Sequence, residues 1–63
     1  MYDVFIYFRE GDVLYCNVTN VSKITIERGF FRIHVDGTRP QDDFFVRSSL
    51  FSLQCVQIEH ETS

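Results

Sequence analysis

The sequence lacks a long apolar run, a leader-like segment and a surplus of basic residues. No stretch approaches the roughly 18 apolar residues of a membrane-spanning helix, and the amino terminus alternates where a signal peptide would be continuously apolar. We therefore expect a cytoplasmic protein that binds no membrane. Nine Asp and Glu residues against six Lys and Arg residues give a formal charge of −3, which argues against a general binder of nucleic-acid phosphates.

Cysteine is scarce, and the two thiols form no recognisable motif. Cys16 and Cys55 lie far apart with no C-x-x-C spacing, so neither a redox pair nor a zinc ribbon is indicated. In a reducing compartment we expect two small buried apolar side chains. If the chain is exported, a disulfide between the two cysteines is the alternative. His34 and His60 lack the short paired spacings of structural zinc sites. We expect no metal and no other cofactor.

Helical periodicity is absent as well. No apolar residues recur at spacings of three and four over ten or more positions, whereas alternation with a period of two is frequent and predicts strands. Asn20 either ends one of these strands or marks a bulge in it. We expect residues 36–43 to form the one long loop and residues 60–63 to form a polar, frayed tail. The predicted strands are residues 2–8, 12–18, 21–27, 30–35, 44–47 and 51–59.

Short strands separated by hairpin breaks predict an all-β fold. Five to six antiparallel strands of this length form a meander that curls into a small barrel or a rolled sheet, SH3-like or OB-like in size. We expect residues 1–59 to form this single domain. One face of the strands would supply the core, with the side chains of Val4, Ile6, Phe8, Leu14, Ile24, Ile26, Phe31, Ile33 and Val35.

The segment "RGFFRIHV", residues 28–35, partly matches the first ribonucleoprotein motif of RNA-recognition domains. Arg28, Gly29 and Phe30 fit the pattern, but Phe31 stands where a small residue belongs and Arg32 where an aromatic residue belongs. The domain that uses this motif also packs two helices on its sheet, and this sequence predicts none. We interpret the segment as a turn followed by a strand.

A second nucleic-acid hypothesis does not need that motif. Small OB-like barrels bind single strands through surface aromatics flanked by basic groups, and Phe30, Arg32 and His34 share one strand face. Three acidic residues in the adjoining loop, residues 36–43, would repel a phosphate chain. Single-stranded nucleic-acid binding is therefore the alternative rather than the leading hypothesis.

Catalytic groups are hard to identify in this sequence. The serines, cysteines and histidines occur in no recognisable catalytic setting. Asp42 and Asp43 are neighbours whose side chains would diverge on a strand. A barrel of this size also has no room beside its core for a ligand cavity of roughly 300 Å³. We predict that the protein is not an enzyme and takes no small-molecule substrate.

Aromatic residues, by contrast, are abundant. Seven Phe and three Tyr residues are more than one small core hides easily, so exposed aromatic surface is expected. Phe, Tyr and Arg are also the residues that the centres of protein interfaces favour. We predict a protein-interaction or self-associating module, homodimers included. Its predicted contact surface consists of Phe30, Arg32, His34, Phe44 and Phe45.

A spaced set of residues in the amino-terminal half carries a family resemblance. The set consists of Tyr2, Val4, Ile6, Phe8, Gly11, Asp12, Val13, Asn17, Val18, Val21, Ile24, Ile26, Gly29, Phe31 and Ile33. In these residues the chain resembles short uncharacterised proteins of Gram-positive bacteria, their phages and mobile elements. The resemblance implies an all-β fold and brings no assigned activity with it.

Overall fold

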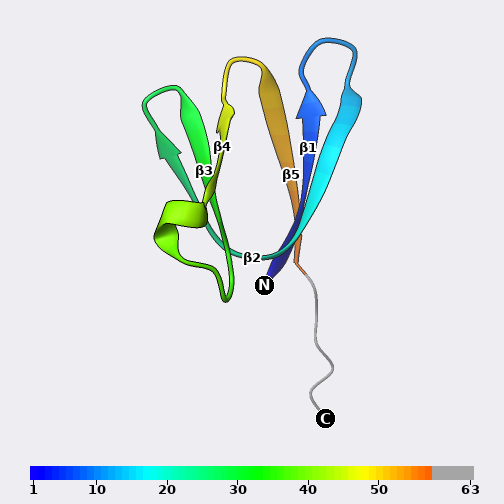
Figure 1. Ribbon diagram of the computed structural model, residues 1–63. Helices are drawn as coiled ribbons and strands as arrows, with labels where there is room; N and C mark the ends of the chain where they lie inside the picture. Colours follow the sequence, from blue (N-terminus) through cyan, green and yellow to red (C-terminus); the bar gives the residue numbers. More distant parts are fainter. Residues whose placement is uncertain (58–63) are drawn as a thin grey trace.

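The computed structural model describes residues 1–57, which form one five-stranded antiparallel sheet (Figure 1). The strands are β1 (Tyr2–Phe8), β2 (Val13–Glu27), β3 (Phe30–Val35), β4 (Phe44–Arg47) and β5 (Phe51–Gln57), in the order β4-β3-β2-β1-β5. The predicted all-β class is confirmed. Within residues 1–57 the one helical element is a short 3₁₀ helix, η1 (Pro40–Asp42), and no helix there is long and apolar enough to cross a membrane.

The two strands predicted at residues 12–18 and 21–27 are one bent strand, β2. Its first half pairs with β1 and its second half pairs with β3. Asn20 lies at the bend with a φ of 59°, a left-handed conformation that Asn adopts more readily than most residues. The register of β2 shifts on both sides of this point. Asn20 therefore marks a bulge, and the sheet has five strands in place of six.

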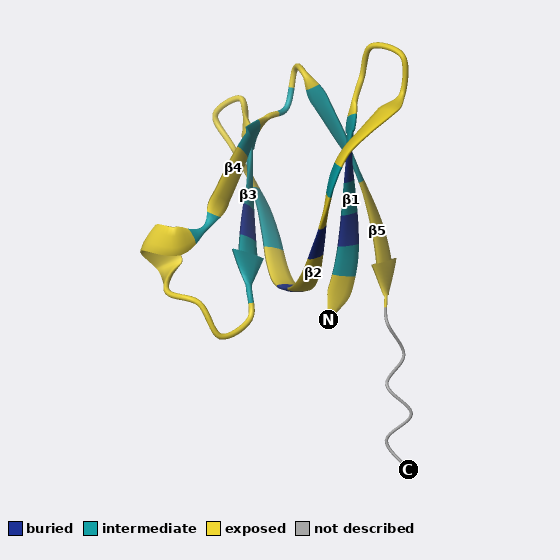
Figure 2. Ribbon diagram, turned by 45° about the vertical axis from the view of Figure 1, so that its right-hand side comes forward, coloured by how far each residue is buried: buried dark blue, intermediate teal, exposed yellow. Residues whose placement is uncertain are grey.

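The bend in β2 folds the sheet on itself, so that one of its faces becomes an inner face. Val21, at the bend, is in register with Tyr2 of β1 and also with Val35 of β3. The core of residues 1–57 is small, and Figure 2 shows its buried positions near the middle of the strands. The buried hydrophobic side chains are Val4, Ile6, Val18, Val21 and Ile33, against which Cys16, Ile24, Val35, Val46, Phe51 and Leu53 pack.

Four residues predicted for the core lie outside it. Phe31 of β3 is half-buried but is not among the side chains that pack against the core, and the other three are near the ends of their strands. Phe8 is 40% exposed, Leu14 51% and Ile26 78%. For Leu14 there is a second reason. A register shift after Ile6 places Leu14 opposite Tyr7, and paired residues point to the same side of a sheet. Leu14 therefore lies on the outer face, away from the core.

The sheet does not close into the barrel that the strand spacing allows. β4 and β5 follow one another in the chain, but they are the two edges of the sheet and are not hydrogen-bonded neighbours. The turn between them is held at both ends, since the Ser48 amide donates to the Gly29 carbonyl and the Arg9 amide donates to the Leu50 carbonyl, each at 2.9 Å. The chain thus crosses from one edge to the other and leaves both edges without a strand partner within residues 1–57.

The predicted loop at residues 36–43 is more ordered than a solvated loop. It begins with a turn in which Gly37 has a φ of 88°, and it ends in η1, with Pro40 at the first turn, where its missing N–H costs no helical hydrogen bond. A 3₁₀ turn is therefore found here, whereas residues 48–50, after β4, form a plain turn. The end of the predicted last strand, residues 58–59, and the predicted tail, residues 60–63, lie outside the described residues.

Candidate functional site

The outer face of β3 and β4 carries four of the five predicted contact residues. Phe30 is opposite Arg47, and Arg32 is opposite Phe45. His34 follows Arg32 by two positions on β3 and therefore points to the same side. The side chains alternate between aromatic and basic across this surface: the Arg32 guanidinium lies 5.5 Å from the centre of the Phe45 ring, and the Arg47 guanidinium lies 5.8 Å from that of Phe30.

Phe44 lies on the opposite side of the sheet. It is in register with Ile33, whose side chain belongs to the core, because neighbouring residues of a strand point to opposite faces. The five predicted contact residues therefore do not form one continuous surface. Both Phe44 and Phe45 are about half exposed, so each face of β4 presents one aromatic ring to its surroundings.

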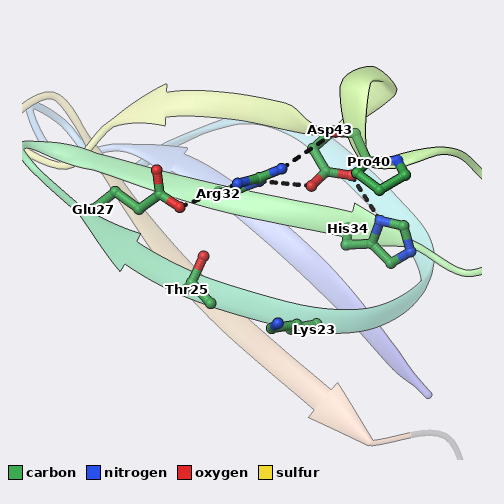
Figure 3. Close-up of a pocket in the computed structure, with 7 residues that line it drawn as sticks. All are labelled: Lys23, Thr25, Glu27, Arg32, His34, Pro40 and Asp43. Carbon is green, nitrogen blue, oxygen red and sulfur yellow. Dashed lines mark hydrogen bonds and ion pairs between the residues drawn. The ribbon is translucent and has the colours of Figure 1, made fainter.

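A buried carboxylate organises the middle of the outer face. Nε of Arg32 donates to Oδ2 of Asp43 at 2.7 Å, and Nδ1 of His34 lies 2.7 Å from Oδ1 of the same carboxylate. The side chain of Asp43 is only 4% exposed, and both of its oxygens have a hydrogen-bond partner (Figure 3). Charge-assisted bonds of this length are among the stronger side-chain contacts in proteins.

The hydrogen bonds change the proton affinity of the groups that form them. The hydrogen bond from His34, and after it the bond from Arg32, lowers the pKa of the Asp43 carboxyl group, although the removal of that group from water acts in the other direction. The bonds to Asp43 and then to Glu27 raise the pKa of the Arg32 guanidinium. At neutral pH this site therefore holds a fixed negative charge beside a fixed positive charge.

Arg32 joins three parts of the chain. Besides Asp43 it contacts Glu27 at the end of β2, with 3.3 Å between Nη1 and Oε2, and the carbonyl oxygen of Pro40 in η1 at 3.4 Å. The turn of η1 sets the position of Asp43, whose amide donates to the Pro40 carbonyl at 3.2 Å. Arg32 and Asp43 thus fasten the segment between β3 and β4 to the outer face.

A hollow of about 400 Å³ lies beside this cluster (Figure 3). Its volume exceeds what the sequence led us to expect for a ligand cavity, but it opens on the surface and does not compete with the core for space. Its lining is polar, and consists of Lys23, Thr25, Glu27, Arg32, His34, Pro40 and Asp43. Within residues 1–57, no hydroxyl or thiol hydrogen-bonds to the His34 ring, so the pairing of nucleophile and base that acyl transfer needs is not formed there.

Three aromatic rings form a second cluster that the sequence did not reveal. Phe8, Tyr15 and Phe51 come from β1, β2 and β5, and their ring centres are 4.9 to 5.2 Å apart, within the range of favourable aromatic packing. Phe8 and Tyr15 remain exposed at 40% and 53%. The register of β1 with β5, which sets Phe8 opposite Phe51, is what brings the rings together.

The two cysteines are free, and the geometry keeps them apart. Cys16 pairs with Ile6 on one side of β1, and Cys55 pairs with Val4 on the other side. Because β1 lies between the strands that carry them, the Cα atoms of Cys16 and Cys55 are about 10 Å apart or more. A disulfide needs Cα atoms within about 7 Å. Cys16 is half-buried, and burial raises the pKa of its thiol. Cys55 is exposed, so the prediction that both thiols are buried is wrong.

The described residues hold no metal-binding cluster of three or more His, Cys, Asp and Glu side chains. His34 is bonded to Asp43, and His60 lies outside residues 1–57. Comparisons of the chain with protein-family models, with curated proteins and with solved structures find no match. The function proposed below therefore rests on the residues and geometry of this chain alone.

Proposed function

We propose that this chain is a small non-catalytic binding module whose partner is a protein, another copy of the chain included. The observation that carries the proposal is the imbalance between buried and exposed apolar side chains. Residues 1–57 bury five hydrophobic side chains, whereas twelve large hydrophobic side chains are exposed. Where exposed apolar side chains gather in one patch on a soluble protein, the patch commonly marks a binding surface.

The aromatic residues of β3 and β4 supply the contact surface for such a partner. Phe30 and Phe45 stand on the outer face with an arginine over each ring, and aromatic and arginine side chains are enriched where interfaces gain most of their affinity. Arg32 and His34 contribute indirectly, because their bonds to Asp43 hold the face in shape. A protein surface suits this patch better than a phosphate chain does.

Charge separates this proposal from single-stranded nucleic-acid binding. The arrangement of arginine over aromatic rings is also found where bases stack, which is the observation in favour of the alternative. However, Asp43 and Glu27 neutralise Arg32, and the chain as a whole carries a charge of −3. Titration with short oligonucleotides at two salt concentrations distinguishes the two, since only nucleic-acid binding predicts an affinity that falls steeply with salt.

Self-association is tested by sedimentation equilibrium over a concentration series from about 1 μM to 1 mM. We expect the mass to rise from 7.5 kDa toward about twice that value, because the interface that a chain of this size offers is small and the dimer dissociates on dilution. A mass of 7.5 kDa across the whole series, together with salt-sensitive binding of oligonucleotides, would overturn the proposal in favour of its alternative.

A further inference from the structure

β5 is an edge strand without the features that usually prevent edge-to-edge pairing. Its seven residues, Phe51–Gln57, contain no charge, no proline and no glycine, whereas natural edges are commonly protected by lysine, proline, bulges or short length. Its pairing with β1 is also free of register shifts. The other edge, β4, is only four residues long and includes Arg47. The two edges of the sheet therefore differ strongly in what they offer a second strand.

The hydrogen-bonding direction of each β5 residue follows from one bond at the start of the strand. The Arg9 amide donates to the Leu50 carbonyl, so this is a hydrogen-bonded pair, and such pairs alternate along an antiparallel ladder. Ser52, Gln54 and Val56 accordingly bond to β1. The N–H and C=O groups of the alternate residues, Phe51, Leu53, Cys55 and Gln57, point away from the sheet.

We propose that two copies of this chain pair through antiparallel β5 strands, with Gln54 of each copy facing Gln54 of the other across a twofold axis. This inference rests on the proposed function, and it assigns self-association to the β5 edge, which is separate from the aromatic contact surface on β3 and β4. In this register all seven residues of each strand are used, and Leu53 of one copy is opposite Cys55 of the other. Four hydrogen-bonded residue pairs then form about eight hydrogen bonds. Shifting the register in either direction leaves some outward groups unpaired.

The occupant is a second copy because the strand is complementary to itself. On the inner side Leu53 faces Cys55, and Phe51 faces the amide side chain of Gln57. On the outer side Ser52 faces Val56, and Gln54 faces Gln54. No like charges oppose one another, since the strand has none. Pairing through a twofold axis also gives a closed dimer, in which the short β4 strands are the two edges of the joined sheet. If β4 of one copy paired with β5 of the next, the assembly would grow into a filament unless it formed a ring.

The register is tested by disulfide trapping in a background that carries Cys16→Ala and Cys55→Ala. Gln54→Cys puts two thiols opposite one another at a non-hydrogen-bonded site, where Cα atoms are about 4.5 Å apart, within disulfide range. Ser52→Cys is the matched control on the same face, because its counterpart in the partner lies about four residues away along the strand, roughly 13 Å. We expect diamide to cross-link Gln54→Cys at least about tenfold faster than Ser52→Cys.

Two outcomes overturn the inference, and they are distinguishable from each other. Equal or slower trapping of Gln54→Cys in a chain that still sediments as a dimer rejects the β5 pairing and leaves the proposed self-association intact. A chain that sediments as a monomer at every concentration rejects both. As a second variant, Cys55→Pro removes an outward N–H while sparing the bonds to β1, so it is expected to give a folded monomer. Thr19→Ala, at an exposed position of β2 away from this edge, is expected to leave the dimer unchanged.

Discussion

Replacing Ile33 with alanine is expected to remove most of the free energy of unfolding of this protein. Ile33 is fully buried in the middle of β3, in register with Ile24 on one side and Phe44 on the other. Truncating a buried Ile to Ala costs about 2–5 kcal/mol. A domain of this size has about 3–9 kcal/mol of stability in total. Urea unfolding followed by circular dichroism should show the midpoint displaced to very low urea, or no folded baseline at all.

Ile26→Ala is the matched control for this substitution. The same residue type stands in the adjacent strand, two positions beyond the partner of Ile33, but its side chain is 78% exposed. The expected change in the free energy of unfolding is within about 0.5 kcal/mol, as at other surface positions. Similar losses in the two variants would contradict the bent sheet, because they would place Ile26 in the core where the alternation of the sequence alone puts it.

Replacing Asp43 with alanine is expected to lower the melting temperature by about 10 °C, the second largest effect. The substitution removes the acceptor of two 2.7 Å contacts and leaves the Arg32 and His34 side chains without the carboxylate that holds them. Loss of one partner of a buried, hydrogen-bonded charge is among the more damaging changes in proteins. Asp42→Ala is the control, since the Asp42 side chain is 56% exposed and its contact with Arg39 is 3.8 Å long; we expect its melting temperature to stay within about 2 °C.

The contribution of Asp43 should also vanish in acid. Because folding lowers the pKa of this carboxyl group, its stabilising effect is fully present above the pKa of the unfolded chain, near pH 4, and is lost as the pH falls further, through the lower pKa of the folded state. The difference in melting temperature between the wild-type chain and Asp43→Ala is therefore expected to be constant from about pH 5 to 7 and to shrink below about pH 4. A difference that persists at pH 2 would mean that the carboxylate charge is not what stabilises the fold.

Much of the sheet could be predicted from the sequence, because alternation with a period of two is a local property. It identified β1 and β3 with their bounds, and it located β4 and the start of β5. The merging of two strands into β2 could not be predicted in the same way. It depends on whether the backbone at Asn20 continues through a bulge or turns away, and that choice is made by the pairing of Val21 with strands on both of its sides.

The candidate site was only partly predictable, since its key contact spans sequence separations that no local pattern encodes. Arg32 and His34 were identified as neighbours on one strand face, but Asp43 was taken for a solvated loop residue that would repel a ligand. The signal that could have found it is the combination of Pro40, which begins η1, with an acid at the first residue after the turn. Phe44 and Phe45 were wrongly assigned to one contact surface. Neighbouring residues of a strand point to different faces of the sheet, so the sequence alone could have separated them.

Amide hydrogen exchange of β5 at low and high protein concentration tests whether two copies of the chain pair through this strand. We expect the outward amides of Leu53 and Cys55 to exchange rapidly in dilute solution and to become protected as the concentration rises, whereas the amides of Ser52 and Gln54, bonded to β1, are protected throughout. Rapid exchange at Leu53 and Cys55 at every concentration, in a sample that sediments as a dimer, would contradict the pairing of two sheets through this edge.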